Sequence, residues 1–258
     1  MAKFENCTGY LVTDDHQWFP VAYTGEISSS STPNTAEFIS AMGQRTPFFR
    51  GNAPRQWQVK ASAKWEWVRA VKALARQRPQ RFYWLSPLGL HTNALPSATP
   101  EGGELVGTRQ VEGYPVEAYL PTDSFPKSTA IPVPQGVSIY GSAYQAGGTL
   151  YLEFYDQAGA KLGYAKYGET KATSGFVKVT TPAVTVPVGA YTARVISSSP
   201  TLVGQYAIFY ETHGMAESGE SECAYVTLHD VEDSHGNIAF KNSPFNLSFT
   251  LKEVSIYG

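Results

Sequence analysis

The chain has 258 residues, of which 16% are charged, and its formal net charge is −2. A net charge this close to zero favours neither nucleic acid nor an anionic membrane surface as a partner. No apolar run reaches the roughly 20 residues of a membrane-spanning helix, and the first residues lack the hydrophobic core of a signal peptide. We therefore expect no membrane insertion and assembly in a cytoplasm. The 16 tyrosines, 23 glycines and 17 prolines are typical of β-sandwiches with many tight turns.

The N-terminal part of the chain predicts a hairpin, a loop and a strand. Residues 10–23 carry apolar and aromatic side chains interrupted by Asp14 and Asp15, which suggests a hairpin. Residues 28–36, SSSSTPNTA, have little packing capacity and are predicted to form a polar loop that could act as a mobile arm. From 56 to 61 polar and apolar side chains alternate, which indicates a half-buried strand.

One helix is predicted after this strand, followed by an apolar strand at 81–85. Apolar residues recur with the 3.6-residue period of an α-helix at Ala63, Trp67, Ala70, Val71 and Leu74. Ser62 is expected to cap the first turn, and Pro79 is expected to end the helix. Glu66 near the start and Arg76 near the end complement the helix dipole.

The helix face opposite this stripe carries an aromatic ring among cations, namely Trp65, Arg69, Lys72 and Arg76. One interpretation is a solvated surface on which Trp65 lies over the aliphatic stems of basic side chains. A second is a contact between subunits, since Trp and Arg are enriched in interfaces. A third is a nucleic-acid patch that grips phosphates and stacks bases. Our hypothesis is the subunit interface, without a specific nucleic-acid ligand.

After residue 103 the chain predicts short strands with turns between them and no helix. The predicted strands are 114–120, 137–144, 149–155, 176–180, 184–186, 191–196 and 203–210. Such a series favours a β-sandwich or jelly roll. The clearest strand, TLYLEFY at 149–155, has two alternating faces: Leu150, Leu152 and Phe154 on one, and Tyr151, Glu153 and Tyr155 on the other.

The C-terminal part predicts two further strands, 224–231 and 246–257, after an acidic linker at 214–222. Two strands alone cannot bury enough apolar area to be stable, so we expect them to pair with the N-terminal region. This predicts a split domain with a sandwich inserted into it. The predicted domains are 1–95 with 223–258, and 96–222.

The two cysteines, Cys7 and Cys223, lie near opposite ends of the chain. Far-separated cysteines in a large unsecreted chain are usually unpaired, buried and apolar. The split domain would contain both of them, which allows them to be close but does not require it.

The sequence carries no catalytic signature. The five histidines lack zinc-site spacing, and no nucleophile elbow is present. The densest polar cluster, HDVEDSH, could form a metal or acid–base site from His229, Asp230, Asp233 and His235, or the solvated tip of a hairpin, which we favour. Glu153 and Glu169 are a conceivable glycosidase pair, but no feature selects them. We predict a protein that is not an enzyme, with no catalytic residue, cofactor or metal.

Four tyrosines of the predicted sandwich could form a surface on which sugars stack: Tyr140, Tyr144, Tyr151 and Tyr155. Flat aromatic rings cover the C–H faces of sugars at low cost. The competing interpretation is that these rings belong to the core and to cross-strand pairs, and we favour it. A sandwich fold by itself does not imply sugar binding.

The flanking segments resemble minor tail proteins of siphophages that infect actinobacteria. The residues that carry this resemblance are RQWQV (55–59), RFYWLSPLGLHTNALPSA (81–98) and NLSFTLKEV (246–254). The middle segments, 138–163 and 176–195, look like a galectin-like or carbohydrate-module-like sandwich. The overall plan is similar to that of the phage distal tail protein.

The resemblance implies a mainly β fold, with a split β-rich belt domain that contains one α-helix and an inserted jelly-roll or galectin-like sandwich. It also implies a structural role in the virion, as a homo-hexameric ring at the tail tip between the tail tube and the tail-tip hub and adsorption proteins. The alternative from another class is a carbohydrate-binding module that recognises a host-surface glycan.

Overall fold

The computed structural model describes most of the chain. The described residues are 9–21, 23–31, 35–39, 45–49, 54–63, 65–76, 81–86, 93–162, 167–171, 175–210, 223–235 and 245–254. The described residues are mainly β, and neighbouring strands such as β1 (Gly9–Val12) and β7 (Phe82–Leu85) pair antiparallel. They also include a helix, α1 (Trp65–Arg76). Among them, no helix has the length and apolar character needed to span a membrane.

The strands fall into four sheets. In chain order they are β1 Gly9–Val12, β2 Trp18–Val21, β3 Tyr23–Ser31, β4 Thr35–Ile39, β5 Arg45–Phe49, β6 Arg55–Ala63, β7 Phe82–Leu85, β8 Gly103–Val111, β9 Tyr114–Pro121, β10 Ile131–Pro132, β11 Ser138–Ala146, β12 Thr149–Tyr155, β13 Tyr167–Lys171, β14 Val177–Thr180, β15 Val184–Thr185, β16 Thr192–Ser198, β17 Leu202–Tyr210, β18 Ala224–His235 and β19 Phe245–Glu253. The sheet orders are β2-β1-β7-β18-β19-β6-β3, β10-β16-β12-β13, β14-β11-β17-β9-β8 with β15 beside β11, and the hairpin β4-β5.

The chain divides into two compact units. One contains residues 1–18 and 83–224, and the other contains residues 19–82 and 225–258. The second unit therefore combines segments from both ends of the sequence. The domain boundaries expected from the sequence, 1–95 with 223–258 against 96–222, stay a prediction.

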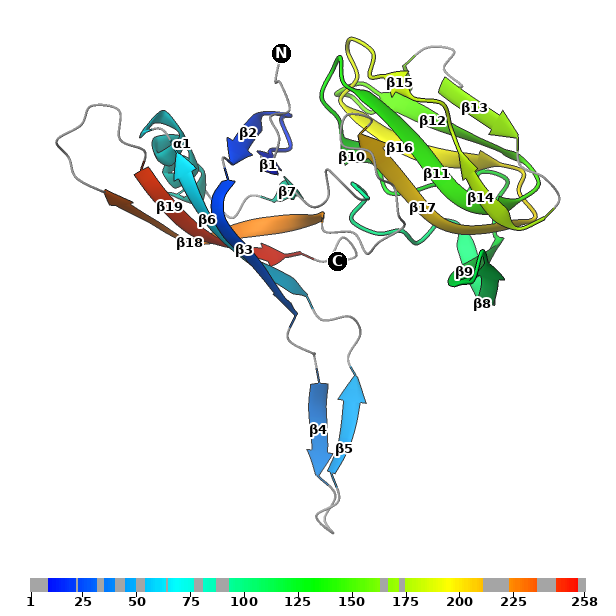
Figure 1. Ribbon diagram of the computed structural model, residues 1–258, viewed down its shortest axis with the longest axis horizontal. Helices are drawn as coiled ribbons and strands as arrows, with labels where there is room; N and C mark the ends of the chain where they lie inside the picture. Colours follow the sequence, from blue (N-terminus) through cyan, green and yellow to red (C-terminus); the bar gives the residue numbers. More distant parts are fainter. Residues whose placement is uncertain are drawn as a thin grey trace. The chain divides into compact units, whose positions relative to one another are not determined.

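Strand β19 closes the second unit by pairing with β6 (Figure 1). Their antiparallel register runs from Phe245 opposite Ala63 to Lys252 opposite Gln56. The expected pairing of the C-terminal strands with the N-terminal region is thus confirmed for β19. Polar and apolar residues alternate along β6 as expected, and the buried ones, Trp57, Val59 and Ala61, lie opposite Leu251, Phe249 and Leu247.

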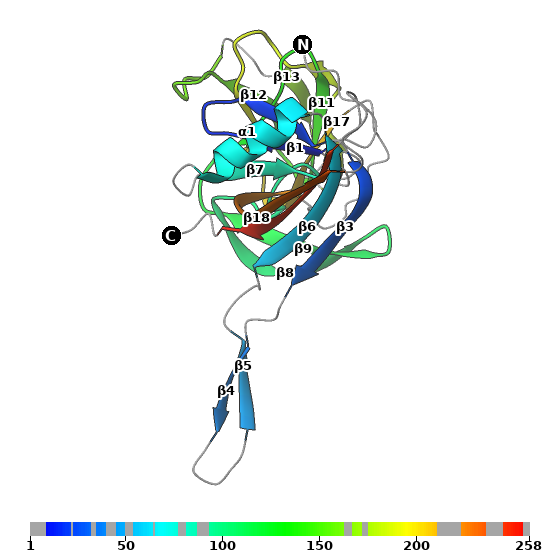
Figure 2. The ribbon, with the colours of Figure 1, turned by 90° about the vertical axis from the view of Figure 1, so that its left-hand side faces the viewer.

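Helix α1 contacts β19. Figure 2 shows the helix together with β6 and β3, which lie side by side in the sheet of this unit. The fully buried residues of α1 are Val68 and Val71. The apolar stripe predicted from the sequence did not include Val68. It included Trp67, which is only half-buried and packs edge-on against the Phe19 ring, with 6.3 Å between the ring centroids. Burial of each valine contributes about 1.5–3 kcal/mol.

The predicted start of the helix was wrong. Ser62 does not cap a helix, because it lies in strand β6 opposite Asn246, and α1 begins at Trp65. The strand continues this far because β19 supplies hydrogen-bonding partners up to Ala63. Pro79, the predicted stop, lies outside the described residues, and α1 ends at Arg76.

The predicted polar loop at 28–36 was also wrong. Residues 28–31 belong to β3, where Ser28 pairs with Gln58 and Ser31 with Arg55, and residues 35–36 begin β4. Serines are poor at packing, but β3 is an edge strand of its sheet in the described part of the chain, so its backbone can pair with β6 without a need for apolar packing. Ser28 and Ser30 are exposed accordingly.

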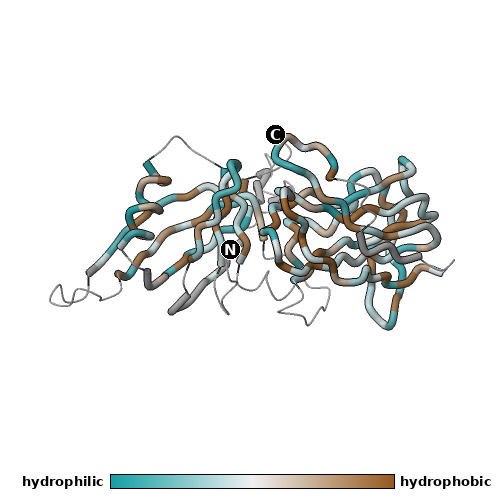
Figure 3. The backbone as a smooth tube through the Cα atoms, turned by 90° about the horizontal axis from the view of Figure 1, so that it is seen from above, coloured by the Kyte–Doolittle hydropathy of each residue, from teal (hydrophilic) through white to brown (hydrophobic). Residues whose placement is uncertain are grey.

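The first unit contains the predicted β-sandwich. Its two sheets face each other across a core to which β12 contributes Leu150, Leu152 and Phe154, all fully buried. Gly141 of β11 marks the closest approach, because a Cβ there would lie 2.8 Å from Val195 of β16. Figure 3 shows hydrophobic residues concentrated along the paired strands of this unit and hydrophilic ones at many of its turns.

A candidate binding cleft on the sandwich

The outer face of sheet β10-β16-β12-β13 carries the most distinctive polar arrangement of the sandwich. In the β12–β16 register, Tyr151 lies opposite Ile196, and Glu153 lies opposite Arg194. Because side chains alternate along a strand, these residues point away from the core that Leu150, Leu152 and Phe154 fill. The two-faced pattern expected for TLYLEFY is confirmed.

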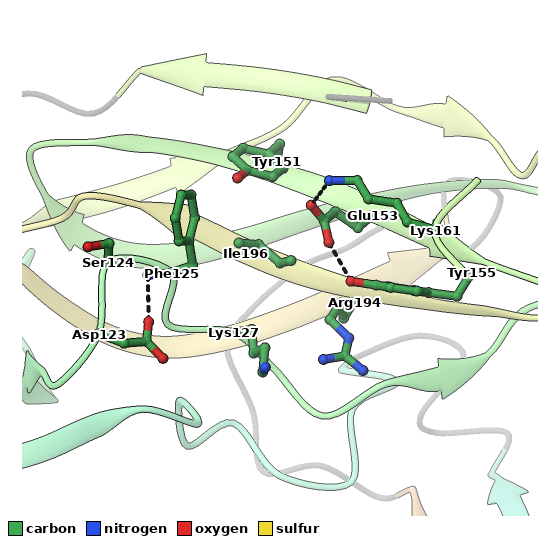
Figure 4. Close-up of a pocket in the computed structure, with 10 residues that line it drawn as sticks. All are labelled: Asp123, Ser124, Phe125, Lys127, Tyr151, Glu153, Tyr155, Lys161, Arg194 and Ile196. Atoms are coloured by element: carbon green, nitrogen blue, oxygen red, sulfur yellow. Dashed lines mark hydrogen bonds and ion pairs between the residues drawn. The ribbon is translucent and has the colours of Figure 1, made fainter. Parts of the chain in front are cut away.

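A cleft of about 510 Å³ opens on this face (Figure 4). Strand β12, strand β16, the segment between β9 and β10, and the turn after β12 all contribute to it. The lining residues are Asp123, Ser124, Phe125, Lys127, Tyr151, Glu153, Tyr155, Lys161, Arg194 and Ile196.

The segment 123–127 forms one wall, and backbone hydrogen bonds hold it in place. The Ser124 carbonyl accepts from the Ser199 amide at 2.8 Å, and Lys127 exchanges two backbone hydrogen bonds with Glu101 at 2.7 and 3.1 Å. The carboxylate of Asp123 accepts from the amide of Phe125 at 2.5 Å. This anchoring presents the Phe125 ring at the cleft with 53% of its surface exposed.

Glu153 is the buried carboxylate of the cleft, with 6% of its surface exposed. One carboxylate oxygen pairs with the Lys161 ammonium, and the other accepts a hydrogen bond from the Tyr155 hydroxyl. The turn that follows β12 positions Lys161, because Leu162 N donates to Phe154 O at 2.9 Å. Burial raises the pKa of Tyr155, and its bond to Glu153 raises it further. Both carboxylate oxygens are therefore engaged within the protein.

Arg194, unlike Glu153, has no ion-pair or hydrogen-bond partner for its charged group among the described residues. Its guanidinium lies over the Tyr155 ring, 4.8 Å from the ring centroid. Its Nε is buried, and no residue in the described part of the chain accepts a hydrogen bond from it. A buried donor without an acceptor costs about 1–3 kcal/mol. The side chain is thus held by ring stacking, with hydrogen-bonding capacity left over.

Chemically, this arrangement is suited to binding. Its aromatic rings offer apolar faces, and its cations and hydroxyls offer hydrogen bonds. The only buried carboxylate among its lining residues is already neutralised by Lys161. The conceivable partner Glu169 lies in β13, but its side chain is outside what the structure describes.

The four predicted stacking tyrosines do not form one surface. Tyr151 and Tyr155 line the cleft, although Tyr151 is only 5% exposed. Tyr140 and Tyr144 lie on β11 in the other sheet, where Tyr140 stacks on Phe209 at 5.1 Å and Tyr144 is buried against Phe176. The core interpretation therefore describes the β11 pair.

The predicted interface residues of α1 differ in their surroundings. Trp65 is 44% exposed, but its ring packs on Phe245 at 5.1 Å between centroids. Lys72 forms an ion pair with Asp233. Arg69 and Arg76 are exposed, and neither has an ion-pair partner among the described residues.

The acidic cluster at 229–235, predicted to belong to a hairpin with a solvated tip, forms the end of strand β18, which pairs antiparallel with the next strand, β19. Residues 236–244, between the two strands, lie outside the described residues. His229 Nε2 is 2.8 Å from Thr227 Oγ1, and Asp233 binds Lys72. Over the described residues, no three His, Cys, Asp or Glu side chains gather as metal ligands would. Cys223 is buried, and Cys7 lies outside the described residues.

Of the lining residues of the cleft, sequence reasoning singled out only Tyr151, Glu153 and Tyr155. It missed the others, among them Phe125, Lys127, Lys161 and Arg194. Phe125 and Lys127 come from an irregular segment with no periodic pattern. The position of Arg194 depends on the register in which β12 and β16 pair, and the local sequence does not reveal that register. The one available signal was Glu153, a carboxylate inside an otherwise apolar and aromatic strand.

Comparisons with known proteins give no family. No family model matches the chain, and no curated protein matches it. One similar solved structure is a carbohydrate-binding module (CBM6cm-2) of Cellvibrio mixtus lichenase 5A in complex with cellotriose, with 16% identity, 44% of this chain and 90% of that chain covered, and a TM-score of 0.29. Another is the enzymatically active domain of bacteriophage CBA120 tailspike protein 4, with 12% identity, 72% of this chain and 19% of that chain covered, and a TM-score of 0.26. At these scores neither similarity carries an inference about function.

Proposed function

We propose that this chain is a structural protein of a bacteriophage tail tip, without catalytic activity, that forms a homo-hexameric ring between the tail tube and the adsorption apparatus. The observation that carries the proposal is the pairing of β19 with β6. It builds one unit from the two ends of the sequence, as in the split belt domain of the tail proteins that the flanking motifs resemble.

A charged clamp reinforces this closure. The guanidinium of Arg55, at the start of β6, donates to Glu253, at the end of β19, through Nε at 3.1 Å and Nη2 at 2.9 Å. The backbone amide of Arg55 donates to the same carboxylate at 2.8 Å. Forked bonds of this kind are geometrically specific. The clamp fixes the register in which the two chain ends meet.

The exposed part of α1 is the proposed subunit contact. Trp65, Arg69 and Arg76 remain accessible, while Lys72 is committed to Asp233. A ring closes when one surface of each subunit binds a different surface of the next. The partner surface is expected to supply an apolar site for the indole and carboxylates for the arginines.

Light scattering of the full chain tests this contact. Trp65→Ala combined with Arg69→Glu should shift the assembly toward monomer while leaving circular dichroism unchanged. Lys60→Glu is the matched control, because Lys60 is an exposed cation on β6 of the same unit. A double variant that assembles like the wild type would exclude α1 from the interface.

A second function, carbohydrate binding by the sandwich, is favoured by the cleft. Phe125 is exposed there, and Tyr155 and a set of hydrogen-bonding groups line the same cleft. A glycan array should then show a binder that Phe125→Ala removes and Val188→Ala does not, since Val188 is an exposed apolar residue that does not line the cleft. Binding that ignores Phe125, or no binding, would reject this function.

A further inference from the structure

The charges of the cleft are unequal. Three cations, Lys127, Lys161 and Arg194, line it together with two carboxylates, Asp123 and Glu153. Lys161 and Glu153 neutralise each other. Asp123 is exposed and caps the backbone of its own turn. Three cations against two carboxylates leave the lining of the cleft with one excess positive charge.

Two of these cations lack an anionic partner. Across the described residues, neither Lys127 nor Arg194 forms an ion pair. Arg194 also keeps a buried Nε without an acceptor. Because this Nε is closed to solvent, an anion in the cleft would meet the two terminal nitrogens of the guanidinium, which carry the rest of its donors.

The Arg194 side chain is already ordered for such a ligand. The contact with the Tyr155 ring restrains the guanidinium, and the hydrogen bond from Tyr155 to Glu153 restrains the ring. Little conformational entropy remains to be lost on binding, which favours affinity. A planar guanidinium matches the two oxygens of a carboxylate in a forked pair of hydrogen bonds.

We infer that the cleft binds an acidic saccharide, with the carboxylate of a uronic-acid-type sugar meeting Arg194 and Lys127 and the sugar ring lying against Phe125. The inference rests on the proposed carbohydrate-binding function and names its ligand class. Phe125 supplies the apolar surface for the C–H face of the sugar. The cations supply the selectivity for the acid, because a neutral sugar leaves them unpaired.

Calorimetry with the full chain at pH 7 tests the inference. The probe is a trimer of galacturonic acid, and its matched control is the carboxyl-reduced trimer, which has neutral galactose units. The wild type should bind the acidic trimer at least about tenfold more tightly than the neutral one, which is the effect of one charge-assisted contact. The difference should shrink as salt is added.

Arg194→Gln should reduce the preference for the acid about tenfold, because Lys127 remains, and should retain weak binding of the neutral trimer. Arg194→Lys should retain part of the preference because it keeps the charge and loses the fork. Arg109→Gln is the control, since Arg109 is an exposed cation on β8 of the same unit that does not line the cleft. Circular dichroism confirms folding, and the salt titration on the wild type stands even if a variant misfolds.

The outcomes separate the two levels of the proposal. Equal binding of both trimers by the wild type, or an acid preference that Arg194→Gln leaves undiminished, would overturn the ligand class and leave carbohydrate binding intact. Binding of neither trimer, with binding of poly(glycerol phosphate) in a third titration, would overturn the saccharide and retain only an anion site. No binding in any of the three titrations would overturn both.

Discussion

The exposed face of α1 and the sandwich cleft both combine an aromatic ring with cations, yet only one of them leaves a donor unsatisfied. On α1, Lys72 pairs with Asp233, and Trp65 packs on Phe245. The remaining arginines are exposed, so water can satisfy their donors.

In the cleft, burial removes that option. Arg194 lies against Tyr155 with its Nε out of reach of water and of any acceptor in the described chain. Glu153, directly opposite on β12, is already occupied by Lys161 and Tyr155. An aromatic ring among cations in a sequence can therefore be interpreted only when the burial of those side chains is known. On α1 the pattern fits a surface for assembly, and in the cleft it fits a ligand site.

The largest expected effect comes from the buried carboxylate of the cleft. Glu153→Ala should lower the free energy of unfolding by about 2–3 kcal/mol, because two hydrogen bonds to a charged group are lost at a buried position. Urea unfolding measures this. Glu104→Ala on exposed β8 is the control and should stay within about 0.5 kcal/mol of the wild type. If Glu153→Ala lowered the free energy of unfolding no more than Glu104→Ala, the buried carboxylate would contribute no more stability than an exposed one.

A smaller effect is expected from the hydroxyl that touches the same carboxylate. Tyr155→Phe should cost about 1 kcal/mol, the usual contribution of one hydrogen bond, while the ring under Arg194 remains. Tyr114→Phe, at a 68% exposed tyrosine, should change nothing measurable in the same urea experiment. Equal losses in the two variants would mean that the Tyr155 bond contributes no stability.

The ion pair on α1 should matter less. Asp233→Asn removes the partner of Lys72, whose side chain is one-third exposed. Exposed pairs contribute about 0–1 kcal/mol, and salt screens them. Thermal unfolding at low and at high salt should therefore show a loss below about 1 kcal/mol that disappears in high salt. A loss of stability that persists in high salt would contradict this, and would show that the Lys72–Asp233 pair is shielded from solvent ions.

At neutral pH the smallest effect is expected at His16, beside the sandwich. Its Nε2 contacts the carbonyl of Tyr191, and its Nδ1 accepts from Trp18 Nε1 at 3.2 Å, so the geometry requires the neutral ring. Tyr191 in turn donates its amide to Tyr155 O at 2.8 Å. Burial lowers the pKa of His16 below its ordinary 6.5.

The sign of the pH dependence follows from that direction. A histidine with a lowered folded-state pKa contributes its full stability above pH 6.5 and loses it as the pH falls through the folded value. Unfolding free energies measured from pH 7.5 down to 5 should decline more steeply in the wild type than in His16→Asn. Asparagine is the suitable replacement because His16 has φ 65°, a conformation that asparagine tolerates. Identical pH profiles would show that His16 does not couple protonation to folding.

Sequence alone could predict what depends on local periodicity. The alternation in TLYLEFY indicated both faces of β12, and the alternation at 56–61 indicated the buried side of β6. The two-residue repeat of a strand leaves little ambiguity when one face is apolar.

What the sequence could not supply depends on pairing and on irregular backbone. The serines of β3 form a strand only because β6 offers an edge. Val68 is buried because of where β19 lies against α1. The cleft combines Phe125 and Arg194. Phe125 comes from a segment without a periodic pattern. Arg194 reaches the cleft because β16 pairs with β12, which is distant in the sequence. None of these relations is written in a local pattern.

The native mass of the wild-type chain tests the central claim most directly. Native mass spectrometry over a range of concentrations should show a species with the mass of six 28.1 kDa chains, because head-to-tail contacts between identical subunits close a ring. A protein that stays at 28.1 kDa at the highest concentration would contradict a self-assembling ring.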